Sequence, residues 1–194
     1  MKALTYNKYR AINIVILSLI FVIAESAVTF GANLWFPELP YTVSLAVIII
    51  SLELIRWNAF GAVAALVSGV AFCLASGANP EQFLIYCIGN LFTLFALIFI
   101  KTVGSEKIRK NSALCAVYVI LVFLLAEVGR GLVAMVLGNE PAILIQFLTT
   151  DALSGLFGII VISIVRNADG MFENQKKYLI RLEEERRAKE MEEY

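Results

Sequence analysis

The chain has 194 residues, of which 60% are hydrophobic and 16% are charged, and its 16 Lys and Arg residues balance its 16 Asp and Glu residues. A typical soluble domain is about 45–50% apolar and about 25% charged, so this composition excludes a water-soluble enzyme and a disordered chain. The zero net charge does not indicate a nucleic acid partner. Because the chain has no His, imidazole bases, Ser-His-Asp and Cys-His nucleophiles and His-based metal sites are excluded. We expect neither an enzyme nor a metal or cofactor site.

Six apolar stretches follow in chain order, and each reaches or approaches the roughly 20 residues that a helix needs to cross a membrane. They are residues 11–36, 41–55, 57–78, 80–100, 112–137 and 141–165. The second is short. The first is too long for a signal peptide, and no small-residue cleavage site follows it. The sequence therefore predicts an all-α membrane protein, with a six-transmembrane-helix bundle over residues 1–168.

Basic residues occur in every second connection. They precede the first stretch, follow the second, fourth and sixth, and comprise Lys2, Lys8, Arg10, Arg56, Lys101, Lys107, Arg109, Lys110 and Arg166. The other three connections lack Lys and Arg, and each contains one acid: Glu38, Glu81 or Glu140. Under the positive-inside rule, this alternation predicts a multi-pass protein of the cell (plasma) membrane with both termini cytoplasmic.

Residues 169–194 form a cytoplasmic tail with a different pattern. Apolar residues are interspersed with basic residues from Met171 to Leu182, which predicts an amphipathic helix on the inner leaflet. Charged blocks then follow from Glu183 to Glu190, as in a solvated helix or a docking helix for a cytoplasmic partner. Nearby, Glu53 and Arg56 are three residues apart and are predicted to pair at the inner surface.

Polar residues lie deep within four of the apolar stretches, where an ionisable group is costly and is a functional hypothesis by default. They are Glu25, Asn90, Glu127, Arg130, Gln146 and Asp151. Glu127 and Arg130 share a helix face and can pair. The set forms either a substrate-binding or ion-binding site or a salt-bridge network that locks the bundle.

The first non-basic connection is aromatic. Trp35 and Tyr41 flank it as interfacial anchors or as a lid over a pocket. The third stretch carries Gly61, Ala65 and Gly69 at four-residue spacing, and the first carries Ala27 and Gly31. Such small residues let helices approach closely, either within the bundle or against another membrane subunit.

The chain resembles the substrate-binding membrane subunit, or S component, of an energy-coupling factor (ECF) transporter. The resemblance covers roughly residues 10–166 and rests on Leu39-Pro40, the Gly/Ala-rich segment 61–69 and Gly89-Asn90-Leu91-Phe92. The family's Ala-x-x-x-Ala repeat in the first helix is represented only by Ala27 and Gly31, so Gly61, Ala65 and Gly69 are the alternative docking face.

The resemblance implies uptake of a vitamin or a related small molecule. The expected partners are the ligand, membrane lipid, a transmembrane coupling subunit and cytoplasmic ATPases. The ligand contacts are then expected from Glu25, Asn90, Glu127, Arg130, Gln146 and Asp151, beneath a lid that contains Trp35 and Tyr41. Two alternatives stay open: a membrane scaffold of cell-shape or envelope machinery, like the MreD family, and a stand-alone proton- or ion-coupled carrier.

Overall fold

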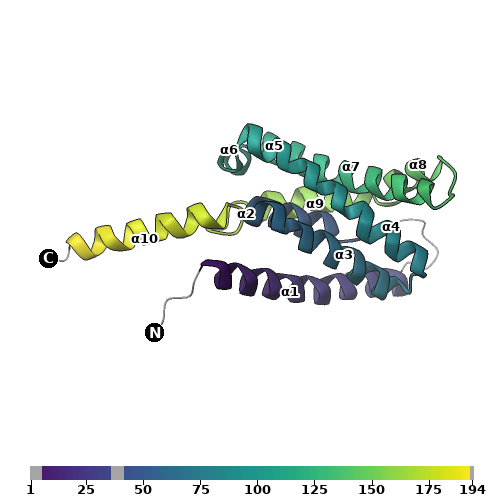
Figure 1. Ribbon diagram of the computed structural model, residues 1–194, viewed down its shortest axis with the longest axis horizontal. Helices are drawn as coiled ribbons and strands as arrows, with labels where there is room; N and C mark the ends of the chain where they lie inside the picture. The colour runs from purple at the N-terminus through teal and green to yellow at the C-terminus, as the bar shows by residue number, and fades with distance from the viewer. Residues whose placement is uncertain (1–5, 36–41, 193–194) are drawn as a thin grey trace.

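The computed structural model describes residues 6–35 and 42–192, and these residues are all-helical, with no β-strand among them. The α-helices are α1 (Tyr6–Trp35), α2 (Ala46–Trp57), α3 (Gly61–Ser76), α4 (Pro80–Asn90), α5 (Ala96–Val103), α6 (Ser105–Lys110), α7 (Ser112–Val136), α8 (Ile143–Thr150), α9 (Ala152–Val165) and α10 (Gln175–Glu192). Two 3-10 helices, η1 (Asn58–Phe60) and η2 (Leu91–Phe95), join α2 to α3 and α4 to α5. Figure 1 shows an elongated bundle from which α10 projects at one end.

Four helical segments are long and apolar enough to cross a membrane, and they cover Tyr6–Trp35, Ala46–Ser76, Pro80–Val103 and Ser112–Val136. A fifth is added if α8 and α9, which are bent by 43° to each other, count as one span. The described residues are therefore all-α, and the protein is membrane-embedded, as the composition predicts. The division into six spans stays a prediction.

The chain reverses between α2 and α3, within the segment Ala46–Ser76. Asn58 has a positive φ of 53°, and a Cβ at Gly61 would lie 3.0 Å from the backbone nitrogen of Leu54. The two helices therefore pack side by side (Figure 1). α2 has only 12 residues, or about 18 Å of helix at the usual rise, so it is shorter than the roughly 30 Å hydrocarbon core.

Two of the predicted spans are interrupted. Residues 80–100 form α4, η2 and α5 rather than one α-helix, and residues 141–165 are broken at Asp151 between α8 and α9. Residues 42–45, which were predicted to lie within the second span, precede α2 and are not helical. Irregular backbone at membrane depth is tolerated where protein covers it or where it lines a water-filled cavity. These interruptions are therefore candidate positions for a site.

Helix α7 lies at the centre of the packing, where it contacts α2, α4, α5, α6, α8, α9 and η2. Its contact with α4 is close, because a Cβ at Gly89 would lie 2.6 Å from the Cα of Arg130. By contrast, α1 packs mainly on α3 and has a row of exposed apolar side chains that includes Ile12, Val15, Ile16, Leu19, Ile20 and Ile23. An exposed apolar face of this length is expected of a helix that contacts lipid.

Most of the tail forms α10, and beyond Leu182 this helix consists mainly of exposed, charged residues. The helix extends away from the bundle along its long axis (Figure 1). The inner-leaflet position of residues 171–182 stays a prediction. α1 begins at the same end of the bundle from which α10 projects (Figure 1).

The tail is anchored to the bundle by a short loop that precedes α10. Phe172 is fully buried, and Arg56 donates hydrogen bonds to the backbone oxygens of Gly170 (2.8 Å) and Met171 (2.9 Å). The predicted pairing of Arg56 with Glu53 is wrong, since both carboxyl oxygens of Glu53 are buried without a hydrogen-bond partner among the described residues. Arg56 is engaged by the loop instead.

Candidate functional site

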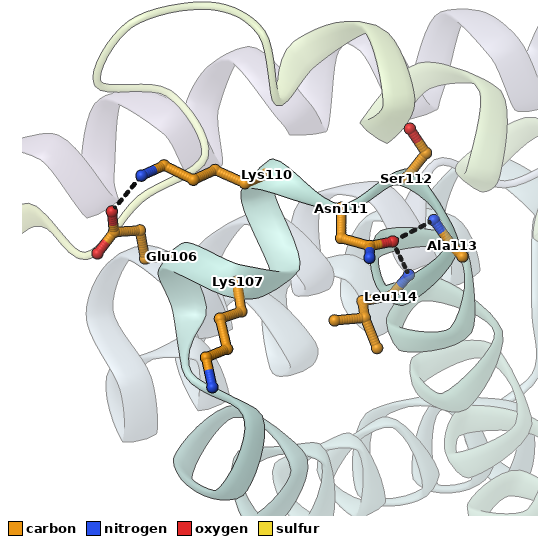
Figure 2. A pocket seen from close by; sticks show the side chains of 7 residues that line it. All are labelled: Glu106, Lys107, Lys110, Asn111, Ser112, Ala113 and Leu114. Atoms are coloured by element: carbon orange, nitrogen blue, oxygen red, sulfur yellow. Dashed lines mark hydrogen bonds and ion pairs between the residues drawn. The ribbon is translucent and has the colours of Figure 1, made fainter.

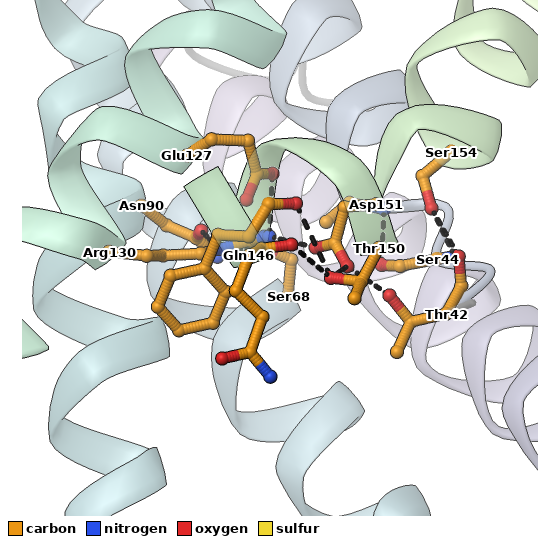
Figure 3. A network of polar contacts seen from close by, with 12 residues as sticks. Thr42, Ser44, Ser68, Asn90, Glu127, Arg130, Gln146, Thr150, Asp151 and Ser154 are labelled. Atoms are coloured by element: carbon orange, nitrogen blue, oxygen red, sulfur yellow. Dashed lines mark hydrogen bonds and ion pairs between the residues drawn. The ribbon is translucent and has the colours of Figure 1, made fainter. Parts of the chain in front are cut away.

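Arg130 is the centre of a buried polar network that joins α4, α7 and the α8–α9 break. Its Nε donates to Asn90 Oδ1 at 2.9 Å, and its Nη1 donates to Glu127 Oε1 at 2.8 Å and Asp151 Oδ2 at 2.6 Å. Asn90 in turn donates to Ser68 Oγ at 3.1 Å. All five side chains are buried. Figure 3 shows them converging from separate helices, so residues far apart in the sequence form one cluster.

The α8–α9 break is held in place by the non-helical segment 42–45. Thr42 donates from its backbone nitrogen to the Thr150 oxygen at 3.1 Å, and its hydroxyl donates to the Asp151 carboxylate. Ser154 accepts from the Ser44 nitrogen at 2.9 Å and donates to the Thr42 oxygen at 3.2 Å. Backbone groups that are exposed by two irregular segments therefore satisfy one another, as they must at membrane depth.

Glu25 lies on α1 and stabilises the start of α2. Its two carboxyl oxygens accept from the Ser44 hydroxyl at 2.7 Å and from the Leu45 backbone nitrogen at 2.6 Å. An acid at the N-terminus of a helix satisfies unpaired N–H groups and is favoured by the helix dipole. Among the described residues, hydrogen bonds link Glu25 to Arg130 indirectly, through Ser44, Ser154 and Asp151.

A hollow of about 400 Å³ lies next to this network, and we call it the α4–α8 hollow. It is lined by Thr42, Asn79, Glu81, Gln82, Ile85, Tyr86, Asn139, Ile143, Gln146, Phe147 and Thr150. At its rim, Asn139 Nδ2 donates to Glu81 Oε1 at 2.9 Å. Its residues come from the segment before α2, from α4, from the connection that follows α7, and from α8. These parts meet at the end of the bundle opposite α10 (Figure 1).

Tyr86 separates the hollow from Arg130. The guanidinium carbon lies 4.6 Å from the centre of the Tyr86 ring, a cation–π distance. The same ring packs against Phe72 and Phe147, with centroid distances of 4.7 and 6.0 Å. The network therefore supports the aromatic floor of the hollow rather than lining it.

The predicted ligand contacts divide into two groups. Glu25, Asn90, Glu127, Arg130 and Asp151 are buried and bonded to protein groups and do not line the α4–α8 hollow, whereas Gln146 does. Figure 3 shows the Gln146 amide pointing away from the network. Trp35, at the end of α1, is 79% exposed. The predicted lid residue Tyr41 lies outside the described residues.

Sequence reasoning missed most of the lining residues of the hollow. Asn79 caps α4, since its side chain accepts from the Gln82 nitrogen at 2.9 Å. Thr42 and Asn139 were not considered as site residues. The only sequence feature that could have indicated these lining residues is the presence of Asn79 and Asn139 in two of the non-basic connections. Asn is also common in turns, so this feature alone does not indicate a site.

The small residues of α3 are used within the chain. Cβ atoms at Gly61 and Gly69 would meet Leu54 and the backbone of Tyr86 and Cys87, and Ala65 is fully buried. This is the internal-packing alternative for the ladder, so these three residues are not available to dock a partner subunit. On α1, Ala27 is exposed, and a Cβ at Gly31 would have open space around it. The predicted docking role of that pair stays a prediction.

A second hollow lies at the end of the bundle from which α10 projects, around the turn from α6 to α7 (Figure 2). Lys110 pairs there with Glu106 at 2.6 Å, and the Asn111 side chain accepts from the Ala113 and Leu114 nitrogens at 2.9 and 3.1 Å. The N-terminus of α7 is thus already capped. Nothing in this hollow is buried and unpaired, and we do not assign it a site.

Comparison with known proteins finds no matching family model, no similar curated protein and no similar solved structure. Within residues 6–35 and 42–192, no three Cys, Asp or Glu side chains are placed to hold a metal ion. The buried Arg130 network and the α4–α8 hollow are therefore the features that bear on function.

Proposed function

We propose that this chain is a substrate-capturing membrane subunit of a micronutrient uptake transporter of the ECF type, with the α4–α8 hollow as its ligand site. The observation that carries the proposal is a polar hollow of about 400 Å³ at the end of an apolar bundle opposite α10. Small-molecule sites are typically clefts of about 300–1,000 Å³ with a few well-placed polar groups.

The orientation in the proposal follows from charge. The end of the bundle that carries α10 also carries Lys107, Arg109, Lys110 and Arg166, and positive loops face the cytoplasm. The hollow then opens to the outside, where a capturing subunit meets its ligand. A coupling subunit and ATPases would act from the other end, to which α10 belongs.

The interrupted elements support a transport role. Transporters commonly form their binding sites from broken helices and unwound backbone. Here the α8–α9 break at Asp151 and the non-helical segment 42–45 bond to each other, and Thr42 and Thr150 from these two segments line the hollow. The Arg130 network would stabilise the helix packing and also hold the Tyr86 ring in position beside the hollow.

The proposal is tested by thermal shift of the purified protein in lipid nanodiscs against a panel of vitamins and nucleobases. A ligand at 100 times its Kd stabilises a protein by about 2.7 kcal/mol. We expect at least one compound to raise the Tm, and we expect Gln146→Leu to weaken that response.

The matched control is Val136→Leu, at an 86% exposed position that does not line the hollow, and it should respond as the unaltered chain does. A complete panel without any response would count against substrate capture and would favour the scaffold alternative. A response that Gln146→Leu leaves unchanged would place the ligand elsewhere.

A further inference from the structure

The charge of the α4–α8 hollow restricts the ligand it can take. Among the described residues that line it, Glu81 is the only charged one, and there is no Lys or Arg. The remaining polar groups are the carboxamides of Asn79, Gln82, Asn139 and Gln146 and the hydroxyls of Thr42, Thr150 and Tyr86. These groups donate and accept hydrogen bonds but do not compensate a negative charge.

Arg130 does not supply the missing positive charge. Its side chain is 3% exposed, and two carboxylates lie within 2.8 Å of its Nη1. The Tyr86 ring covers the guanidinium on the side of the hollow. The buried network contains one guanidinium and three carboxyl groups, those of Glu25, Glu127 and Asp151. An anionic ligand in the hollow would therefore meet no excess of positive charge.

We infer that the α4–α8 hollow binds an uncharged or cationic small molecule rich in hydrogen-bonding groups and excludes anions. The inference rests on the proposed function, and it narrows the ligand class within it. A cationic amine would meet Glu81 at the rim, carboxamides would bond the polar edge of the ligand, and Tyr86 and Phe147 would contact its apolar or aromatic part.

Charged thiol reagents test this inference without knowledge of the ligand. Gln146→Cys is prepared with Cys73, Cys87 and Cys115 replaced by Ala, and the protein is held in nanodiscs so that both faces are accessible. Its reaction rates are measured with trimethylammonium-ethyl methanethiosulfonate, a cation, and with sulfonatoethyl methanethiosulfonate, an anion. Both reagents convert the thiolate into a mixed disulfide and release methanesulfinate. The cation-to-anion rate ratio is compared with that of free cysteine.

A nearby carboxylate attracts the cationic reagent and repels the anionic one, and the effect is larger at low ionic strength. We expect a ratio above that of free cysteine and expect Glu81→Gln to lower it, since Gln can keep the bond to Asn139. A ratio at or below that of free cysteine would overturn the inference and leave the proposed function standing. If neither reagent reacts, the hollow is closed to water, and both the inference and the proposed function fail.

Discussion

Replacing Arg130 by Met removes the centre of the buried network while keeping an unbranched side chain in place. The change leaves the carboxyl groups of Glu127 and Asp151 and the amide oxygen of Asn90 without the donors that lie 2.6–2.9 Å from them. Removing one partner of a buried ion pair costs about 3–5 kcal/mol, because a buried charge is left uncompensated. We expect a loss of stability in that range.

The assay is reversible unfolding of the purified protein in mixed micelles with increasing denaturing detergent. Arg109→Met is the matched control, because Arg109 is partly exposed and lies 3.5 Å from Glu173, and such a pair contributes roughly 1 kcal/mol or less. Adding Glu127→Gln and Asp151→Asn to Arg130→Met should recover part of the loss. The reasoning is refuted if Arg130→Met unfolds at the same detergent concentration as the Arg109→Met control.

Three further predictions use the same unfolding assay. Glu25→Leu should destabilise the protein by about 1–3 kcal/mol, because it leaves buried donors at the start of α2 unsatisfied. Glu53→Leu should be neutral or stabilising, because no described residue bonds to that carboxylate. Equal losses of stability in the two variants would contradict this contrast. Gly129→Ala should destabilise by about 1–3 kcal/mol through overpacking, because its Cβ would collide with the Gly89 oxygen, and an unchanged midpoint would show that α4 and α7 can separate. Asn79→Ala should cost about 0.5–2 kcal/mol through loss of the cap on α4, and Asn79→Asp, which keeps an acceptor, should retain most of the stability; a similar loss in both variants would argue against capping.

Local patterns in the sequence predict several features of the fold and of the buried network. The i, i+3 spacing of Glu127 and Arg130 predicts their pairing, and the two side chains do pair. The Asn-Pro-Glu pattern at residues 79–81 predicts the start of α4, which begins at Pro80 with Asn79 as its cap. Both features depend on one helical turn, so neighbouring residues determine them.

The breaks that shape the site were not predictable in this way. The α8–α9 break occurs at Asp151 without a Gly or Pro beside it, and the sequence is mostly apolar on both sides of the break. It is stabilised by Thr42, more than a hundred residues away in the sequence, so no local pattern contains the cause. For the same reason, the role of Glu25 at the start of α2 was not predictable, because the segment 42–45 reads as part of an apolar span.

The most direct test of whether the α4–α8 hollow holds a ligand is native mass spectrometry of the intact protein, released from nanodiscs prepared directly from producing membranes. We expect a small-molecule adduct on the unaltered chain and on Val136→Leu, and we expect its loss on Gln146→Trp, which fills the hollow. An adduct that persists in Gln146→Trp, or an unaltered chain that carries none even after incubation with the vitamin and nucleobase panel, would contradict the claim.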